Sequence, residues 1–113
     1  ATPDATLDVE GTVKFGPTGK IFSEVREVTG TTEATSYYTS VAYPTGYSMA
    51  NTRVLSVEIN AGGTAWVGLG YNSANTANIP ISYNLASTTL YIMYPDLSSF
   101  HSKAFRVMLM RVQ

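Results

Sequence analysis

Residues 53–71 read Arg-Val-Leu-Ser-Val-Glu-Ile-Asn-Ala-Gly-Gly-Thr-Ala-Trp-Val-Gly-Leu-Gly-Tyr. In the first half, Leu55, Val57 and Ile59 alternate with polar residues, which is the pattern of a strand with one buried face. Two glycines then interrupt the pattern before a second run of strand-forming residues. The stretch therefore predicts a β-hairpin with strands over 53–60 and 64–71, and Leu55, Val57 and Ile59 facing the core.

The rest of the chain repeats these signals on both sides of the hairpin. Runs rich in Val, Ile, Thr and Tyr are separated by Gly, Pro and Asn, and no window keeps the spacing of an amphipathic helix. About seven or eight short strands with frequent turns indicate an all-β fold, an antiparallel β-sandwich or barrel-like head. A turn is expected at 16–19 and a polar loop at 29–36. Further strands are predicted at Leu7–Phe15, Lys20–Val28, Ser36–Tyr43, Ile79–Tyr83, Thr88–Tyr94 and Lys103–Val112.

The last predicted strand is apolar on both faces. Phe105, Val107 and Leu109 alternate with Met108 and Met110, whereas a strand with one wet face should alternate apolar with polar residues. Two interpretations remain open at this point. A loop of the same chain covers the second face, or the second face packs against another subunit.

Length and charge limit the function classes. At 113 residues the chain is expected to form one domain, with residues 1–19 as a short extended stem and 20–113 as the head. The net charge of −1 predicts no nucleic-acid partner, and the dispersed cations and short apolar runs predict no membrane insertion. No signal peptide is visible in the opening residues, and a chain that ends in a strand-like run is typical of a C-terminal fragment.

Catalytic and metal-binding patterns are weak. There is no cysteine, and the single histidine, His101, follows Asp96 and Ser99 in one short segment. Catalytic triads are assembled from separate elements, so we interpret this segment as a polar loop. One histidine without a second His or Cys predicts no metal site. We expect no enzymatic activity and no cofactor.

Aromatic residues favour recognition instead. All eight tyrosines and the only tryptophan lie between Tyr37 and Tyr94, and residues 34–102 contain only three charged side chains other than His101, which are Arg53, Glu58 and Asp96. Tyrosine with Ser, Gly and Asn forms surfaces that bind by rigid aromatic contact and adaptable hydrogen bonds. Trp66 is interpreted as structural. The candidate ligand-binding residues are Tyr37, Tyr38, Tyr47, Tyr71, Asn72, Asn75 and Asn78.

The opening Leu-Asp-Val-Glu-Gly-Thr-Val-Lys-Phe-Gly-Pro-Thr-Gly, residues 7–19, resembles the Gly-punctuated end of a bacteriophage tail-fibre shaft. The remainder of the chain, residues 20–113, resembles the compact β head that caps such fibres. The resemblance implies a homotrimer at the tip of a tail fibre on the virion, acting outside the host cell. It also implies recognition of a host-surface saccharide or protein as receptor.

Other function classes stay open beside this one. The head could have a purely structural role, folding and registering a trimer without a ligand. It could also be a carbohydrate-binding module of a secreted protein or, more remotely, a glycan-cleaving enzyme. Oligomeric state separates the viral classes from a monomeric binding module, and adsorption to cells separates receptor binding from structure alone.

Overall fold

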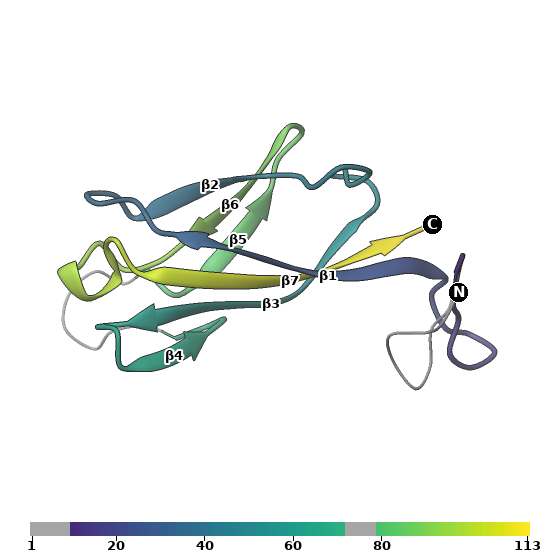
Figure 1. The fold of residues 1–113 in the computed structure, drawn as a ribbon, viewed down its shortest axis with the longest axis horizontal. Helices are drawn as coiled ribbons and strands as arrows, with labels where there is room; N and C mark the ends of the chain where they lie inside the picture. Colours follow the sequence, from purple (N-terminus) through teal and green to yellow (C-terminus); the bar gives the residue numbers. More distant parts are fainter. Residues whose placement is uncertain (1–9, 72–78) are drawn as a thin grey trace.

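The computed structural model describes residues 10–71 and 79–113. In this part of the chain, seven strands form two antiparallel sheets that pack as a β-sandwich, as the sequence predicts (Figure 1). None of the described segments is a helix long and apolar enough to cross a membrane. The elements are β1 (Phe22–Thr31), β2 (Tyr38–Ala42), β3 (Thr52–Ala61), β4 (Ala65–Gly68), β5 (Ser82–Leu85), β6 (Thr89–Met93), a 3-10 turn η1 (Ser98–Phe100) and β7 (Ala104–Val112).

The predicted hairpin is confirmed as β3 and β4. Gly62 and Gly63 turn the chain with positive φ angles of 62° and 76°. Glycine adopts these angles without steric cost, and tight hairpin turns require them. The Gly63 amide donates to the Asn60 carbonyl at 3.0 Å, which closes the turn.

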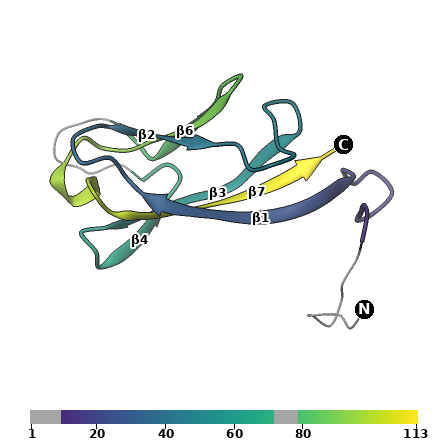
Figure 2. The ribbon, with the colours of Figure 1, turned by 45° about the horizontal axis from the view of Figure 1, so that its top comes forward.

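The two sheets differ in how the chain builds them. The sheet with strand order β1-β7-β3-β4 is here called sheet A, and the sheet with order β2-β6-β5 is called sheet B. In sheet A the C-terminal strand β7 lies in the centre and pairs antiparallel with both β1 and β3. Sheet B consists of shorter strands with β6 in its centre. The two sheets form the layers visible in Figure 2.

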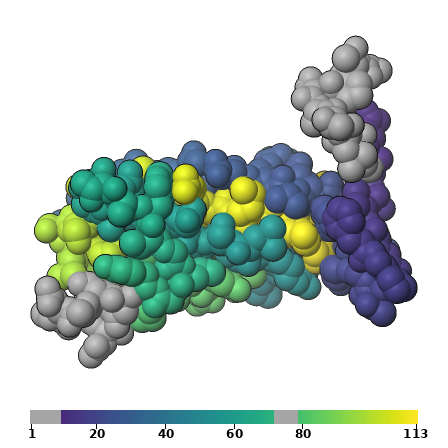
Figure 3. All heavy atoms as spheres, turned by 90° about the horizontal axis from the view of Figure 1, so that it is seen from below, coloured from purple at the N-terminus to yellow at the C-terminus, as the bar shows by residue number. Residues whose placement is uncertain are grey.

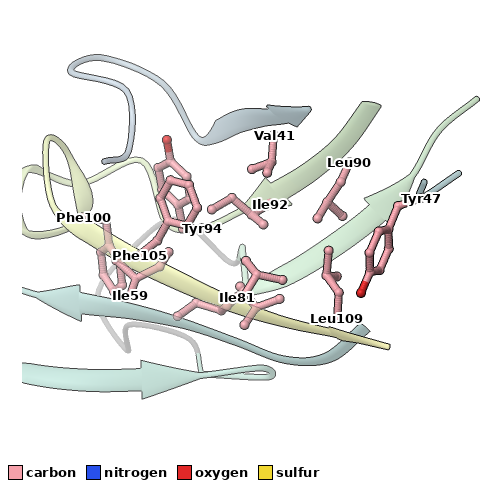
Figure 4. Close-up of a cluster of buried hydrophobic side chains, with 12 residues drawn as sticks. Val41, Tyr47, Ile59, Ile81, Leu90, Ile92, Tyr94, Phe100, Phe105 and Leu109 are labelled. Carbon is pink, nitrogen blue, oxygen red and sulfur yellow. The ribbon is translucent and has the colours of Figure 1, made fainter. Parts of the chain in front are cut away.

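Residues that alternate along the strands fill the space between the sheets (Figure 4). Val57, Ile59, Val107 and Leu109 from sheet A are each fully buried, and they meet the inward side chains of β2 and β6. Burying apolar side chains of this size contributes about 1.5–3 kcal/mol each. The buried apolar side chains from sheet B are Val41, Leu90 and Ile92, and Tyr47, Ile81, Tyr94, Phe100 and Phe105 complete the cluster.

Leu55 does not face the core as the alternation predicts. The pairing of β3 with β7 shifts register between Val54 and Ser56, which is the mark of a β-bulge. An extra residue in one strand reverses the alternation locally, so Leu55 is 48% exposed while Val54 packs against the core. The alternation in the sequence therefore predicts the strand correctly but does not predict the bulge.

Other boundaries also differ from the prediction. Strand β1 continues through Thr31, because the expected polar loop pairs with the start of β7 down to Ala104. Strand β5 lies at Ser82–Leu85 rather than over 79–83, since the backbone of Ile81 hydrogen-bonds to Gly70 and Tyr71 and pairing with β6 begins only at Ser82.

The N-terminal segment stands apart from the sheets. The predicted strand over 7–15 falls partly outside the described residues, and from 10 to 15 it makes only one bridge, between Val13 and Phe22. The expected turn at 16–19 is present, with the Gly19 amide 3.3 Å from the Gly16 carbonyl. Figure 2 shows this purple segment beyond the end of the sandwich. The division into a stem over 1–19 and a head over 20–113 stays a prediction.

Candidate functional site

The outer face of sheet B carries tyrosines without charge. Strand alternation buries Thr39 and Val41 of β2, so Tyr38 and Ser40 point outward. In β6, Leu90 and Ile92 are buried, and Tyr91 therefore points outward. The outward side chains of the sheet are Tyr38, Ser40, Ala42, Ser82, Asn84, Thr89, Tyr91 and Met93.

Strand register brings these side chains into neighbouring positions. Tyr38 pairs with Met93, and Ser40 pairs with Tyr91, which in turn pairs with Asn84 on β5. Side chains directly opposite each other on one face of antiparallel strands lie about 5 Å apart at Cβ. The register therefore places an amide and a thioether beside the aromatic rings.

Three tyrosines form an edge-to-face chain on this surface. The ring centroids of Tyr37 and Tyr38 are 5.2 Å apart with an interplanar angle of 70°, and those of Tyr38 and Tyr91 are 5.9 Å apart at 71°. Such T-shaped pairs are favourable because the positive edge of one ring meets the negative face of the next. The rings border a hollow of about 320 Å³, which is lined by Tyr37, Tyr38, Asn84, Tyr91 and Met93.

Buried hydrogen bonds hold the strands that carry the hollow. The Tyr94 amide donates to the Tyr37 carbonyl at 2.9 Å and thereby fixes the backbone of the first ring beside the end of β6. Below the sheet, the hydroxyls of Thr39 and Tyr94 are 2.8 Å apart. Burial raises the pKa of the Tyr94 hydroxyl, and the Thr39 hydrogen bond acts in the opposite direction.

The turn after β5 is fixed in a similar way. The Tyr43 hydroxyl donates to the Ala86 carbonyl at 2.6 Å, and the Ala86 amide donates to the Thr89 carbonyl at 2.9 Å. Burial raises the pKa of Tyr43, so its hydroxyl keeps the proton that it donates. These bonds set the position of the β5–β6 hairpin and hence of Asn84.

Comparison of the chain with protein-family models, with curated proteins and with solved structures found no match. The chemistry of the surface must therefore be interpreted from its own side chains. Its donors and acceptors are three phenol groups and one amide, and none of the side chains that line the hollow is charged. Such a lining can stack against an apolar ring face and hydrogen-bond to hydroxyl groups around it.

The structure brings together only part of the predicted ligand-binding set. Tyr37 and Tyr38 border the hollow and are 47% and 40% exposed. Tyr71 is 45% exposed but lies elsewhere, with its ring centroid 6.2 Å from that of Phe100. Asn72, Asn75 and Asn78 fall outside the described residues.

Tyr47 belongs to the core rather than to this surface. It is only 7% exposed, and the guanidinium groups of Arg26 and Arg111 lie 5.8 and 5.6 Å from its ring centroid. Burial, with a smaller contribution from the Glu24 carboxylate, raises the pKa of Tyr47 from 10.0 to about 12, while both arginines act to lower it. The candidate site therefore omits Tyr47, because a ligand cannot reach a ring that the protein already covers.

Sequence reasoning missed Tyr91, Asn84 and Met93. The signal for Tyr91 and Met93 was present, because Leu90 and Ile92 alternate with them in the strand predicted over 88–94. Asn84 had no such signal, since the predicted strand ended one residue before it. Its place beside Tyr91 depends on the pairing of β5 with β6.

The other candidates from the sequence lie away from the hollow. His101 Nε2 lies 2.7 Å from Asp96 Oδ1 in the loop around η1, and no serine hydrogen bonds to this histidine side chain among the described residues. Within the same residues, no group of three or more His, Cys, Asp or Glu gathers as a metal site would require. Trp66 lies on sheet A with the Arg106 guanidinium 4.0 Å from its ring centroid.

Proposed function

We propose that this chain is a noncovalent recognition domain, the head of a bacteriophage tail fibre, that binds a host-surface saccharide in the tyrosine hollow of sheet B. The observation that supports the proposal most directly is the chain of three tyrosine rings, spaced 5.2 and 5.9 Å apart, beside the Asn84 amide and without a charged neighbour in the lining. Sugars present apolar C–H faces and hydroxyl edges, which match rings and amides respectively.

The hollow suits a small ligand better than a protein partner. Small-molecule sites are concave, are mostly apolar and contain a few polar groups that fix orientation. A hollow of about 320 Å³ lies at the lower end of the usual range for ligand pockets. An uncharged lining favours neutral sugars over acidic ones, because an anion would lose its hydration without gaining a cation.

The remaining parts of the proposal come from the resemblance of residues 7–19 to a fibre shaft. We propose that three copies of the chain at a fibre tip bind the receptor together. Several weak sites on one particle gain avidity by a factor of about 100 to 10,000 when the receptor is repeated on the cell surface. A saccharide coat provides such repetition, so each single site needs only modest affinity.

The test uses a matched pair of tyrosines. Tyr38 and Tyr83 are both 40% exposed on strands of sheet B, but only Tyr38 lines the hollow. Binding of the purified chain is measured on a panel of lipopolysaccharides and capsular polysaccharides extracted from bacteria. Tyr38→Ala should weaken binding about tenfold or more by loss of one stacked ring, while Tyr83→Ala should leave it within about twofold.

Two outcomes would contradict the proposal. One is equal loss in both variants, which would mean that the hollow is not the site. The other is no binding to any polysaccharide at high micromolar concentration by a folded chain, which would leave the structural role in a virion. A chain that binds glycan as a clean monomer would instead favour a carbohydrate-binding module of a secreted protein.

A further inference from the structure

The outer face of sheet A is apolar along its central strand. Met108 and Met110 of β7 point away from the core, because Phe105, Val107 and Leu109 point into it. Val25 of β1, which pairs with Met110, is 46% exposed. Figure 3 shows this face, with the yellow side chains of β7 open between β1 and β3. No described segment lies over them, so the first of the two interpretations of this strand, a covering loop, has no support in this part of the chain.

The bulge in β3 adds to the same apolar surface. By breaking the alternation, it turns Leu55 outward at 48% exposure beside the row that contains Met110 and Arg53. A leucine at this position costs the isolated domain the burial of a large side chain. A second surface that covers Leu55, Met108 and Met110 would recover that burial.

Charges on this face are arranged in two different ways. Arg106 and Glu58 pair with each other at 2.7 Å, and Arg106 also stacks on Trp66, so these groups are satisfied within the chain. Glu27 forms no ion pair among the described residues, and Arg53 donates only to backbone carbonyl groups nearby. Glu27 lies on the β1 side of the methionine stripe and Arg53 on the β3 side.

This arrangement is complementary to a copy of itself. When copies are related by rotation about an axis along β7, the β1 side of one copy meets the β3 side of the next. Along this axis, Glu27 of one copy is then offset by two residues, or ~7 Å, from Arg53 in the neighbour, because Glu27 pairs with Met108 and Arg53 with Met110. We propose that the outer face of sheet A joins copies of this chain, with Met108 and Met110 nearest the axis and Glu27 paired with Arg53 across each contact.

The size of the face is compatible with such a contact. Strands about 4.8 Å apart, with a rise of about 3.3 Å per residue, give sheet A an outer face on the order of 15–19 Å by 30 Å, or roughly 500 Å² in plan. The accessible area of a corrugated layer of side chains exceeds its plan area. Stable interfaces bury about 800 Å² per partner, so most of this face has to take part.

An interface on sheet A also affects receptor binding. The interface itself is inferred from this face alone, and only the number of three copies rests on the proposed function. Sheets A and B present opposite faces of the sandwich. Contact through sheet A therefore leaves every tyrosine hollow on the outside of the assembly, where several hollows can reach one coated surface. Multivalent binding requires this geometry.

The oligomeric state of the purified chain tests the inference. Light scattering at about 100 μM is expected to give three times the chain mass of 12.2 kDa, and Met108→Glu is expected to reduce this to a single chain. Thr89→Glu, the same added charge on the outer face of sheet B, is the matched control and should leave the mass unchanged. Circular dichroism and the melting temperature show whether each variant is folded.

Charge reversal provides a second and milder set of variants. Glu27→Arg and Arg53→Glu should each weaken association about tenfold or more, and the double variant should restore it. A twofold instead of a threefold mass that responds in the same way would support the interface and contradict the number of copies. A folded chain that stays at 12.2 kDa, or an assembly that none of these changes affects, would overturn the inference.

Polysaccharide binding by the Met108→Glu monomer keeps the two proposals separate. If the monomer still binds glycan at single-site affinity, with avidity reduced by at least tenfold, the result supports both proposals: the contact through sheet A and the glycan site in the hollow of sheet B. If Met108→Glu dissociates the assembly as expected but the chain binds no glycan, the result supports the interface on sheet A. It then contradicts only the receptor-binding proposal.

Discussion

The two sheets of the sandwich differ in both charge and exposed apolar residues. All strand residues that carry a charge, three in β1, two in β3 and two in β7, belong to sheet A. The strands of sheet B contain tyrosine, serine, threonine and asparagine instead. The contrast between a charged and an uncharged region in the sequence thus becomes a contrast between two layers. These are the two layers for which we propose a contact between copies, on sheet A, and a neutral ligand surface, on sheet B.

The largest expected effect is a difference in stability between substitutions on the two faces of strand β6 in sheet B. Ile92 is fully buried and Tyr91, its neighbour, faces the hollow. Ile92→Ala should lower the free energy of unfolding by about 2–5 kcal/mol through lost burial and a cavity. Tyr91→Ala should lower it by about 1 kcal/mol or less and weaken glycan binding instead.

Urea denaturation of both variants, with glycan binding measured on the folded fraction, checks this difference. The result would count against the outward position of Tyr91 if both changes destabilised the fold equally.

The next effect distinguishes a covered tyrosine from those on the open face. The pKa of Tyr47 is raised to about 12, so above pH 10 the unfolded chain releases this proton while the folded protein retains it. The free energy of unfolding therefore falls as pH rises from 10 to 12, by about 2 kcal/mol for this group. In Tyr47→Phe that contribution is absent, and the stability should fall less over the same window.

Denaturation curves at several pH values measure both proteins. Tyr43 and Tyr94, whose pKa values burial also raises, are common to both proteins, so their contributions cancel in the difference. At pH 7 the substitution should leave the free energy of unfolding unchanged or raise it, because it removes a buried hydroxyl that has no hydrogen-bond partner among the described residues. Parallel curves from pH 10 to 12 would show that Tyr47 titrates normally.

A smaller loss of stability is expected when Arg106 of sheet A, which is paired within the chain, is substituted. Arg106→Ala removes both the stack on Trp66 and the ion pair with Glu58, and should cost about 1 kcal/mol of stability. Arg106→Lys keeps the charge but not the planar stacking group, and should recover about half of that loss. Glycan binding should be unaffected in both, because the residue lies on the opposite face from the hollow.

The smallest effect on the isolated chain is expected at the bulge. Because Leu55 is 48% exposed, Leu55→Ser should change the melting temperature of the monomer by no more than about 2–4 °C. Association between copies should weaken nevertheless, which light scattering over a dilution series can measure. A large loss of monomer stability would mean that Leu55 is covered within its own chain.

Strand identity could be predicted from the sequence because alternation is a local signal. Val57 and Ile59 in β3, and Leu90 and Ile92 in β6, face the core as their spacing indicates. Their β-branched or otherwise apolar side chains leave little choice of face. The two-sided apolar pattern of β7 was also visible, and the contact between copies that we propose would account for the apolar residues on its outer face.

The assembly of strands into sheets could not be predicted in this way. Which strands pair depends on contacts between distant residues, and the place of β7 between β1 and β3 leaves no trace in local spacing. The same cause limited the site. Tyr37 and Tyr38 were found as tyrosines in a polar stretch, but Asn84 joins them only through the pairing of β5 with β6.

The central place of β7 imposes an order on synthesis. Strands β1 and β3 leave the ribosome long before the strand that hydrogen-bonds between them, while sheet B already has its three strands when β7 is made. Until then β1 and β3 have unpaired edges, and such edges in a nascent chain can pair with neighbouring chains. The edges of β1 and β3 that face β7 are therefore open to pairing with neighbouring chains until the nine residues of β7 have emerged.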